Sequence, residues 1–331
     1  MLTTIQIKNF RCFRELEIAP LRRINLITGQ NNTGKTALLE ALALMLAQPD
    51  PSVCGNLPNE FRAGVGNADW EENFWGWLFH KKDRSLAIEL SGTLEEGSRI
   101  GWRLHKSSHD GMEVFYETSV SNIRLANINC WPLGTGQTRD PLTAVHFWTR
   151  PSDPNKDAVD FNRVVVKRRK KELVELLQPV EANLETLEAL QVGKQGQQQA
   201  PLIYADLQGL PEMIPVTHLG QGFCRLLDIY SEILASDAQV LLVDEIENGI
   251  HHSIMPIVWK GLFHAAKEAD LQIFATTHSW ECILAADHAA REAGSYDLSL
   301  IRLDRVDGDV KATVMDEKTL TTAKELQWEL R

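Results

Sequence analysis

Short apolar runs and alternating apolar positions predict strands in the first 150 residues, with one helix among them. Patterns typical of strands occur at residues 4–7, 24–28, 86–90, 99–105 and 144–148. The longer apolar run at residues 37–46 contains no helix breaker and predicts a helix.

The second half predicts helices first and an alternation of helices and strands afterwards. Residues 156–190 fit a helical pattern with a break at Pro179, and the glutamine-rich residues 191–200 predict a connector. From Ile203 onward helices and strands alternate, which is typical of α/β layering.

Composition excludes several classes of protein. The 331 residues are 44% apolar, which suits a soluble protein with a sizeable core. No apolar run reaches about 18 residues, so we expect no membrane span. The first residues lack a basic segment followed by an apolar one, so we expect no secretion signal there. The five cysteines are scattered and odd in number, so we expect reduced thiols and a cytoplasmic location.

The chain is acidic, with a net charge of −11 and a pI near 5.4. This balance argues against a surface built for nonspecific nucleic-acid binding. Residues 167–171 are all basic, with Arg163 one turn before them, and we interpret this basic run as a solvated surface. Contact with a phosphate backbone is the alternative, and it would give salt-sensitive, sequence-independent binding. DNA therefore stays a candidate partner.

A glycine-rich loop between a predicted strand and a predicted helix gives the strongest signal for function. Strand 24–28 leads into this phosphate loop and helix 37–46 follows it. The loop fits G-x-x-x-x-G-K-[ST], the pattern of P-loop nucleotidases. Its residues are Gly29, Gln30, Asn31, Asn32, Thr33, Gly34, Lys35 and Thr36. We predict that the chain binds a nucleoside triphosphate.

The residue types of the loop explain what it would do. Gly29 and Gly34 allow backbone angles that other residues avoid, and a close approach to a ligand. The loop amides lie at the positive end of a helix dipole and would bind phosphate oxygens. Lys35 would reach the β- and γ-phosphates, and the Thr36 hydroxyl would sit on Mg²⁺.

Two acids follow a second buried strand. Residues 239–245 form a short apolar run that ends in Asp244 and Glu245. Ligands of open α/β sheets bind at this edge of a sheet. Asp244 would hold the Mg²⁺ that Thr36 also contacts. Glu245 would orient and deprotonate the attacking water, and a positioned base is worth about 10²–10⁴-fold in rate.

Two further segments complete the predicted site. Residues 271–279 predict another buried strand that leads to His278, which would hydrogen-bond the γ-phosphate or the attacking water. Gly220, Gln221 and Gly222 precede a predicted helix at 224–235. This signature segment places free amides at the start of a helix dipole.

These four segments, in this order, resemble the ABC class of ATPases and, more narrowly, the AAA-type ATPases allied to the RecF, SMC and OLD families. The resemblance spans nearly the whole chain and is carried by residues 7–13, 29–36, 38–40, 219–222, 243–251 and 276–279. It implies an α/β P-loop fold like an ABC head, with a mixed β lobe, a parallel-sheet core and an inserted helical lobe.

We expect a single domain over residues 1–331. Its parts would be a phosphate-loop and β-rich lobe at 1–150, a helical lobe with the signature segment at 151–235, and an acid-strand and switch-histidine part at 236–331.

The resemblance also implies a head-to-head homodimer with ATP held between the two chains. The signature segment of one chain would close on the γ-phosphate held by Lys35 of the other. The usual signature serine is missing, Asn32 stands where many members have Gly, and Ile246 replaces a common Pro. We expect neither a long coiled coil nor a TOPRIM nuclease domain. A separate nuclease or toxin-like effector is a candidate partner, by analogy with systems that defend against phages.

We therefore expect a Mg²⁺-dependent ATPase whose dimer closes and opens with nucleotide state. It would act as a motor or switch for DNA transactions or for a separate effector. The alternative is a nucleotide-gated scaffold that assembles a partner complex with little turnover. Glu245 favours the ATPase, because a scaffold needs no base, whereas the missing effector domain favours the scaffold.

Overall fold

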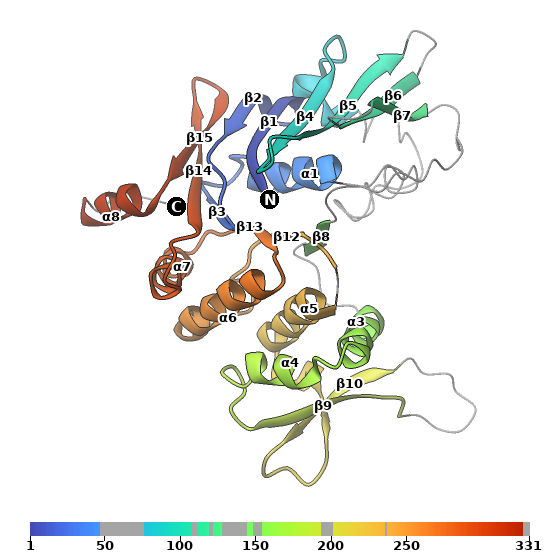
Figure 1. The fold of residues 1–331 in the computed structure, drawn as a ribbon, viewed down its shortest axis with the longest axis vertical. Helices are drawn as coiled ribbons and strands as arrows, with labels where there is room; N and C mark the ends of the chain where they lie inside the picture. Colours follow the sequence, from blue (N-terminus) through green and yellow to red (C-terminus); the bar gives the residue numbers. More distant parts are fainter. Residues whose placement is uncertain are drawn as a thin grey trace.

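The computed structural model describes residues 1–46, 76–107, 111–118, 122–127, 144–147, 154–192, 201–235 and 237–326. Its described strands form three sheets, two of six strands and one of three (Figure 1). Helix α1 lies between the two larger sheets, and the small sheet lies beyond α3, α4 and α5 (Figure 1).

The core sheet has the strand order β15-β14-β3-β13-β12-β8. Its neighbours are parallel except for the β14–β15 pair at one edge. β3, β12 and β13 are buried throughout, as expected for parallel strands covered on both faces. The strands are β3 (Ile24–Thr28), β8 (Ala144–Phe147), β12 (Val240–Val243), β13 (Gln272–Thr276), β14 (Leu298–Val306) and β15 (Asp309–Met315).

The β lobe is a second sheet with the order β2-β1-β4-β5-β6-β7, antiparallel at every pairing. Burial alternates along β4, so one face of the sheet packs on the core and the other faces solvent. The strands are β1 (Leu2–Phe10), β2 (Phe13–Ile18), β4 (Ile88–Leu94), β5 (Arg99–Ser107), β6 (Gly111–Thr118) and β7 (Asn122–Asn127).

Helix α1 (Lys35–Leu46) joins the two larger sheets. It contacts β4 and β5 of the β lobe and β8, β12 and β13 of the core sheet. Every residue of α1 except Thr36 is buried, which explains why the helix is apolar on all sides. Its one buried acid, Glu40, pairs with Arg11 between β1 and β2, with Nε and Oε2 2.8 Å apart. Helix α1, which follows the phosphate loop, is therefore fixed to the β lobe by both packing and an ion pair.

Helices α5, α6 and α7 cover the opposite face of the core sheet (Figure 1). α5, α6 and α7 share one apolar cluster with the sheet, and α3 and α4 pack against α5. The helices are α3 (Pro154–Val166), α4 (Lys170–Leu177), α5 (Gln221–Ala235), α6 (Met255–Glu268), α7 (Trp280–Glu292) and α8 (Glu317–Glu325). Short 3₁₀ turns lie at η2 (Gly76–Leu78), η3 (His80–Lys82), η4 (Val216–Leu219) and η5 (His252–Ile254). In the described ranges, no helix has both the length and the hydrophobicity needed to cross a membrane.

The helical prediction for residues 156–190 is wrong beyond Leu177. There α4 ends, and β9 (Leu184–Leu190) pairs antiparallel with β10 (Leu202–Leu207), which pairs with β11 (Ile214–Pro215). Leu184 and Leu187 have the three-residue spacing of a helix, yet both are buried as strand residues. Pairing with β10 overrides the local pattern. The predicted helical lobe at 151–235 therefore also contains a three-stranded sheet.

The basic run is largely neutralised within the chain. Residues 167–169 form the turn between α3 and α4. Lys167 pairs with Asp237 at 2.8 Å, Arg169 with Glu172 at 2.7 Å and Lys170 with Glu188 at 2.6 Å. These carboxylates compete with any phosphate for the same cations and favour the solvated-surface interpretation.

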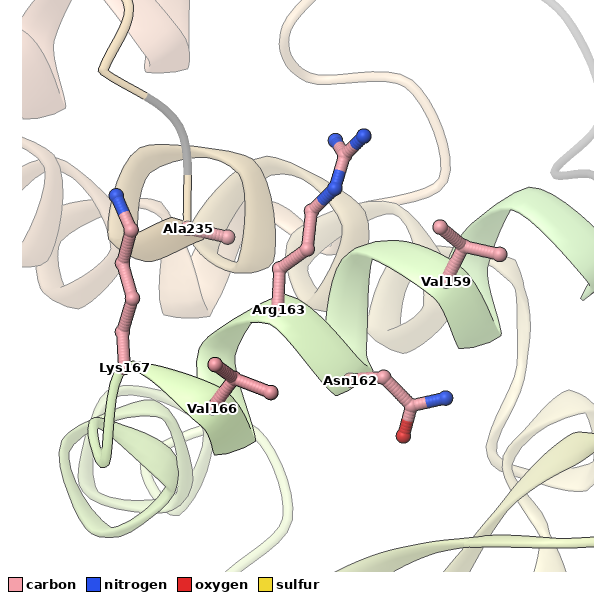
Figure 2. A pocket seen from close by; sticks show the side chains of 6 residues that line it. All are labelled: Val159, Asn162, Arg163, Val166, Lys167 and Ala235. Atoms are coloured by element: carbon pink, nitrogen blue, oxygen red, sulfur yellow. The ribbon is translucent and has the colours of Figure 1, made fainter.

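A surface pocket of about 520 Å³ lies between α3 and the end of α5 (Figure 2). It is lined by Val159, Asn162, Arg163, Val166, Lys167 and Ala235. Arg163 and Lys167 belong to the basic run, but none of the six residues belongs to the predicted ATP site, so the pocket and that site are separate features.

Asp228 on α5 faces the acidic side of α3. Burial raises the pKa of Asp228 to about 8, and the charge of Asp157 and a hydrogen bond to it act in the same direction. Lys156 opposes this shift and Asp160 adds to it. Together these contributions favour the protonated form of Asp228.

This raised pKa predicts a pH-dependent stability. The folded chain binds the proton of Asp228 more tightly than the unfolded chain, whose aspartates titrate near 3.8. The contribution is present at acidic pH and is lost as the pH rises through about 8. We expect Asp228→Asn to gain Tm over the native chain between about pH 5 and 8.5. The gain should be several degrees, since about 1 kcal/mol corresponds to about 2–4 °C.

Thermal unfolding at a series of pH values measures this difference. Asp237→Asn, at an exposed aspartate paired with Lys167, is the control and should follow the native profile over this range. Parallel curves for the native chain and Asp228→Asn would contradict the prediction.

Candidate functional site

Three loops meet at the carboxyl edge of the core sheet, because β13 lies between β3 and β12. Backbone hydrogen bonds join them directly. The Thr277 N–H donates to the Ile27 carbonyl at 3.0 Å, and the Ile246 N–H donates to the Thr276 carbonyl at 3.1 Å. The phosphate loop, the acid loop (residues 244–250) and the loop after β13 therefore form one connected edge.

The phosphate loop takes its shape from close neighbours. Gly29 has φ +139° and Gly34 has φ +101°, both in the region that favours glycine. A Cβ on Gly29 would lie 2.4 Å from the Leu303 carbonyl oxygen, and one on Gly34 would lie 2.5 Å from Cys12 Sγ. Both glycines are therefore required by conformation and by packing.

The other loop residues divide into buried and exposed ones. Thr33 is buried and donates its hydroxyl to the Gln30 carbonyl at 2.8 Å, which closes the turn. Asn31 and Asn32 are exposed, and the Asn32 carbonyl accepts a bond of 3.2 Å from Arg305 on β14. The exposed tip is the part of the loop open to a ligand or to another chain.

Lys35 is buried at the start of α1. Its Nζ donates to the carbonyls of Gly29 at 2.8 Å and Gln30 at 3.0 Å. Burial lowers the pKa of Lys35, while the carboxylates of Asp244, Glu245 and Glu247 favour its charged form. The ammonium therefore lies inside the loop and faces the acid loop.

Asp244 is held between two hydroxyls from different loops. Its Oδ2 accepts from Thr36 Oγ1 at 3.2 Å, and its Oδ1 accepts from Thr276 Oγ1 at 2.6 Å. Asp244 is only 8% exposed, so its carboxylate is fixed in direction. A carboxylate beside a threonine hydroxyl is an oxygen donor set that suits Mg²⁺.

Glu245 has an unusual backbone. Its φ is +48°, in the left-handed region that non-glycine residues seldom adopt. Its N–H donates to Thr276 Oγ1 at 2.8 Å, and its carbonyl accepts from the Asn248 N–H at 3.0 Å. Such a conformation persists where the surroundings hold it and is common at functional sites.

His278 lies beside the acid loop. Its N–H donates to Glu247 Oε1 at 2.7 Å, and this bond ties the loop after β13 to the loop after β12. The backbone of His278 is therefore held beside the acid loop by Glu247.

The signature segment packs on the acid loop of its own chain. Gly220 and Gln221 are exposed, whereas a Cβ on Gly222 would lie 2.2 Å from the Gly249 carbonyl oxygen. Gly220 has φ +92° with open space beside it. In the part of the chain that the structure describes, no hydrogen bond or ion pair links this segment to the phosphate loop.

Three residues of the site escaped the sequence interpretation. Thr276 orients Asp244, Glu247 anchors His278, and Arg225 on α5 donates Nη2 hydrogen bonds to the carbonyls of Asp244 and Glu245. Thr276 and Glu247 lie in two of the segments that carry the resemblance, 276–279 and 243–251, but the sequence interpretation gave neither a role. Arg225 follows the signature segment by three residues and lies outside every motif.

A family model described as an AAA domain matches residues 4–208, more than half of the chain. The chain belongs to the AAA-domain family. A second AAA-domain model, named for the AbiEii toxin of a type IV TA system, matches residues 166–283, which include the signature segment and the acid loop.

Relatives of this AAA domain support an ATPase. Over 335 residues it is 24% identical to an ATP/GTP phosphatase of Helicobacter pylori, across 88% of this chain and 89% of that protein. It is 46% identical over 44 residues to RecF of Idiomarina loihiensis, and 39% identical over 62 residues to an OLD nuclease of Thermus scotoductus. These two shorter matches cover 13% and 18% of this chain and 12% of each relative.

The fold is similar to that of a solved SMC head bound to the C-winged helix domain of ScpA. The TM-score is 0.62 and the identity 12%, over 97% of this chain and 99% of that chain. The predicted P-loop fold is thus confirmed. This chain is an AAA-type ATPase domain that has the fold of an SMC head and short stretches of sequence similar to RecF and OLD proteins.

The close approach of Gly222 to Gly249 predicts an unusual response to alanine. Glycine to alanine inside a helix normally stabilises, but a methyl group on Gly222 would displace the acid loop. We expect Gly222→Ala to lose about 1–3 kcal/mol of unfolding free energy. Gln221→Ala, one residue earlier and exposed, should stay within about 0.5 kcal/mol. Denaturant unfolding measures both, and equal stabilities would contradict the contact.

Proposed function

We propose that this AAA domain hydrolyses ATP with Mg²⁺ in sites shared between two copies of the chain, and that dimer closure switches a separate effector. The observation that carries the proposal is the Asp244 carboxylate, held by the hydroxyls of Thr36 and Thr276 with Glu245 beside it. Phosphoryl transfer depends mainly on positioning and charge stabilisation, and this arrangement supplies both.

Each residue has a definite task in this proposal. Lys35 exchanges the carbonyls of Gly29 and Gln30 for the β- and γ-phosphates of ATP. Thr36 and Asp244 hold Mg²⁺, which when bound neutralises phosphate charge. Glu245 takes a proton from the attacking water. His278 contacts the γ-phosphate from the loop after β13.

The placement of the signature segment supports a shared site. Gly220 and Gln221 face outward on one lobe, and the phosphate loop exposes Asn31 and Asn32 on the other. An ATP bound at Lys35 would therefore meet the signature segment of a second copy. The two copies would form a closed, two-fold dimer.

The relatives point to the kind of effector. One SMC head is bound to ScpA, one relative is a nuclease, and one family model is named for a toxin. We propose that the closed dimer presents a surface to a nuclease or toxin-like protein, with DNA as a candidate ligand and defence against phages as the setting. Free thiols at Cys12, Cys224 and Cys282 suit a reducing, cytoplasmic compartment.

Removing the base tests the reaction. We expect Glu245→Gln to lower kcat about 10²–10⁴-fold, because the amide cannot accept a proton, while affinity for ATP stays near the native value. Phosphate release and equilibrium binding of a fluorescent ATP analogue measure the two quantities. Glu292→Gln, an exposed glutamate paired with Lys260, is the control and should be native in both. Native turnover in Glu245→Gln would instead favour the nucleotide-gated scaffold.

Removing the metal ligand tests the second part. We expect Asp244→Asn to raise the Mg²⁺ concentration for half-maximal ATPase activity about tenfold or more, because a charged oxygen donor is lost. Titration of Mg²⁺ at saturating ATP measures this shift, with Asp237→Asn as the exposed control. An unchanged Mg²⁺ dependence would remove Asp244 from the metal site.

A further inference from the structure

Arg225 links α5, which we call the signature helix because it begins in the signature segment, to the acid loop of the same chain. It lies on α5, one turn after the signature segment. Its Nη2 donates to the carbonyl oxygens of Asp244 and Glu245, the latter at 3.2 Å. The proposed metal ligand and the proposed base are therefore both held, through their backbones, by a side chain of the signature helix.

A second contact strengthens this link. Gly222 packs so closely on Gly249 that a Cβ would lie 2.2 Å from the Gly249 carbonyl oxygen. The first turn of α5 thus touches the acid loop at its end, through Gly222, and at its start, through Arg225. A displacement of this turn cannot leave the acid loop where it was, because close-packed contacts transmit strain.

The backbone of Glu245 is the part most sensitive to such a displacement. With φ at +48°, it keeps its conformation only while its surroundings hold it. The Thr276 hydroxyl on β13 accepts a hydrogen bond from the Glu245 N–H, and the Asn248 N–H in the acid loop donates one to the Glu245 carbonyl. Arg225 holds it from the signature helix.

The charge of Arg225 also stabilises its position beside the acid loop. Burial lowers its pKa, while the carboxylates of Asp244, Glu245 and Glu247 favour its charged form. A guanidinium stays protonated in proteins. Arg225 and Lys35 therefore both balance the charge of the acid loop.

We propose that Arg225 is a positioning residue that couples the two ATP sites of the dimer. This inference rests on the proposed function, in which the signature segment of one chain meets the γ-phosphate bound by the other. When the signature segment engages the partner's ATP, α5 shifts or stiffens, and Arg225 sets the Glu245 backbone for hydrolysis at its own site. Each site reaches its full rate when the other is occupied.

Steady-state ATPase rates over a range of ATP concentrations test the coupling. We expect the native chain to show a Hill coefficient above about 1 for ATP, the sign of coupled sites. Arg225→Gln should bring it to about 1 and lower kcat by up to about 10²-fold, the scale of a small misplacement of a catalytic group. Its KM should stay within about threefold, because Arg225 does not touch the phosphate loop.

Two further variants separate positioning from folding. Arg225→Lys keeps the charge and one donor, and should recover part of kcat and of the cooperativity. Arg163→Gln, an arginine on α3 paired with Asp160, should behave as the native chain. Native kcat and cooperativity in Arg225→Gln would overturn the proposal. So would parallel losses of kcat and ATP affinity that Arg225→Lys does not rescue.

Light scattering distinguishes the coupling role of Arg225 from the shared ATP site on which that role rests. Glu245→Gln and the double variant Glu245→Gln with Arg225→Gln should both double in mass with ATP and Mg²⁺. If both double in mass while Arg225→Gln retains native cooperativity, the coupling role is wrong and the shared site stands. If the single variant Glu245→Gln stays a monomer with ATP and Mg²⁺, the shared site is wrong. The proposed coupling through that site is then wrong as well.

Discussion

The hydrogen bonds that fix the Asp244 carboxylate are the interaction on which the rest of the site depends. They come from Thr36, at the start of α1, and Thr276, at the end of β13. Both can reach Asp244 only because β13 lies between β3 and β12, with Thr276 paired to Ile27. Strand order, helix start and carboxylate direction are thus one constraint, and each half of the molecule is needed to satisfy it.

Charge completes this arrangement. Two cations, the buried Lys35 and the partly buried Arg225, interact with the carboxylates of Asp244, Glu245 and Glu247. These carboxylates offset the cost of removing the two cations from water. Lys35 donates to loop carbonyls, whereas Arg225 donates to the backbone of the acids. In the proposed function, Lys35 would be the cation that moves to the ligand and Arg225 the one that keeps the acids in position.

The sequence predicted the parts of this site that rest on local patterns. Strand 24–28, the phosphate loop and the buried strands before Asp244 and His278 follow from short apolar runs and glycine positions. Arg225 and Thr276 could not be predicted, because their roles depend on which strand lies beside which. The helical prediction for residues 184–190 was wrong for the same reason, because pairing with β10 overrides their helical spacing. The roles of the individual site residues remain predictions.

Crosslinking between chains tests the shared site most directly. One copy would carry Gln221→Cys in the signature segment and the other Asn31→Cys in the phosphate loop, both exposed positions, each with Glu245→Gln to prevent turnover. A short bis-maleimide would be added with or without ATP and Mg²⁺, and Asn31→Cys alone would control for native thiols. We predict a covalent dimer that forms with nucleotide and needs both cysteines. No such dimer in any nucleotide state, although each variant binds ATP, would contradict a site completed by a second copy.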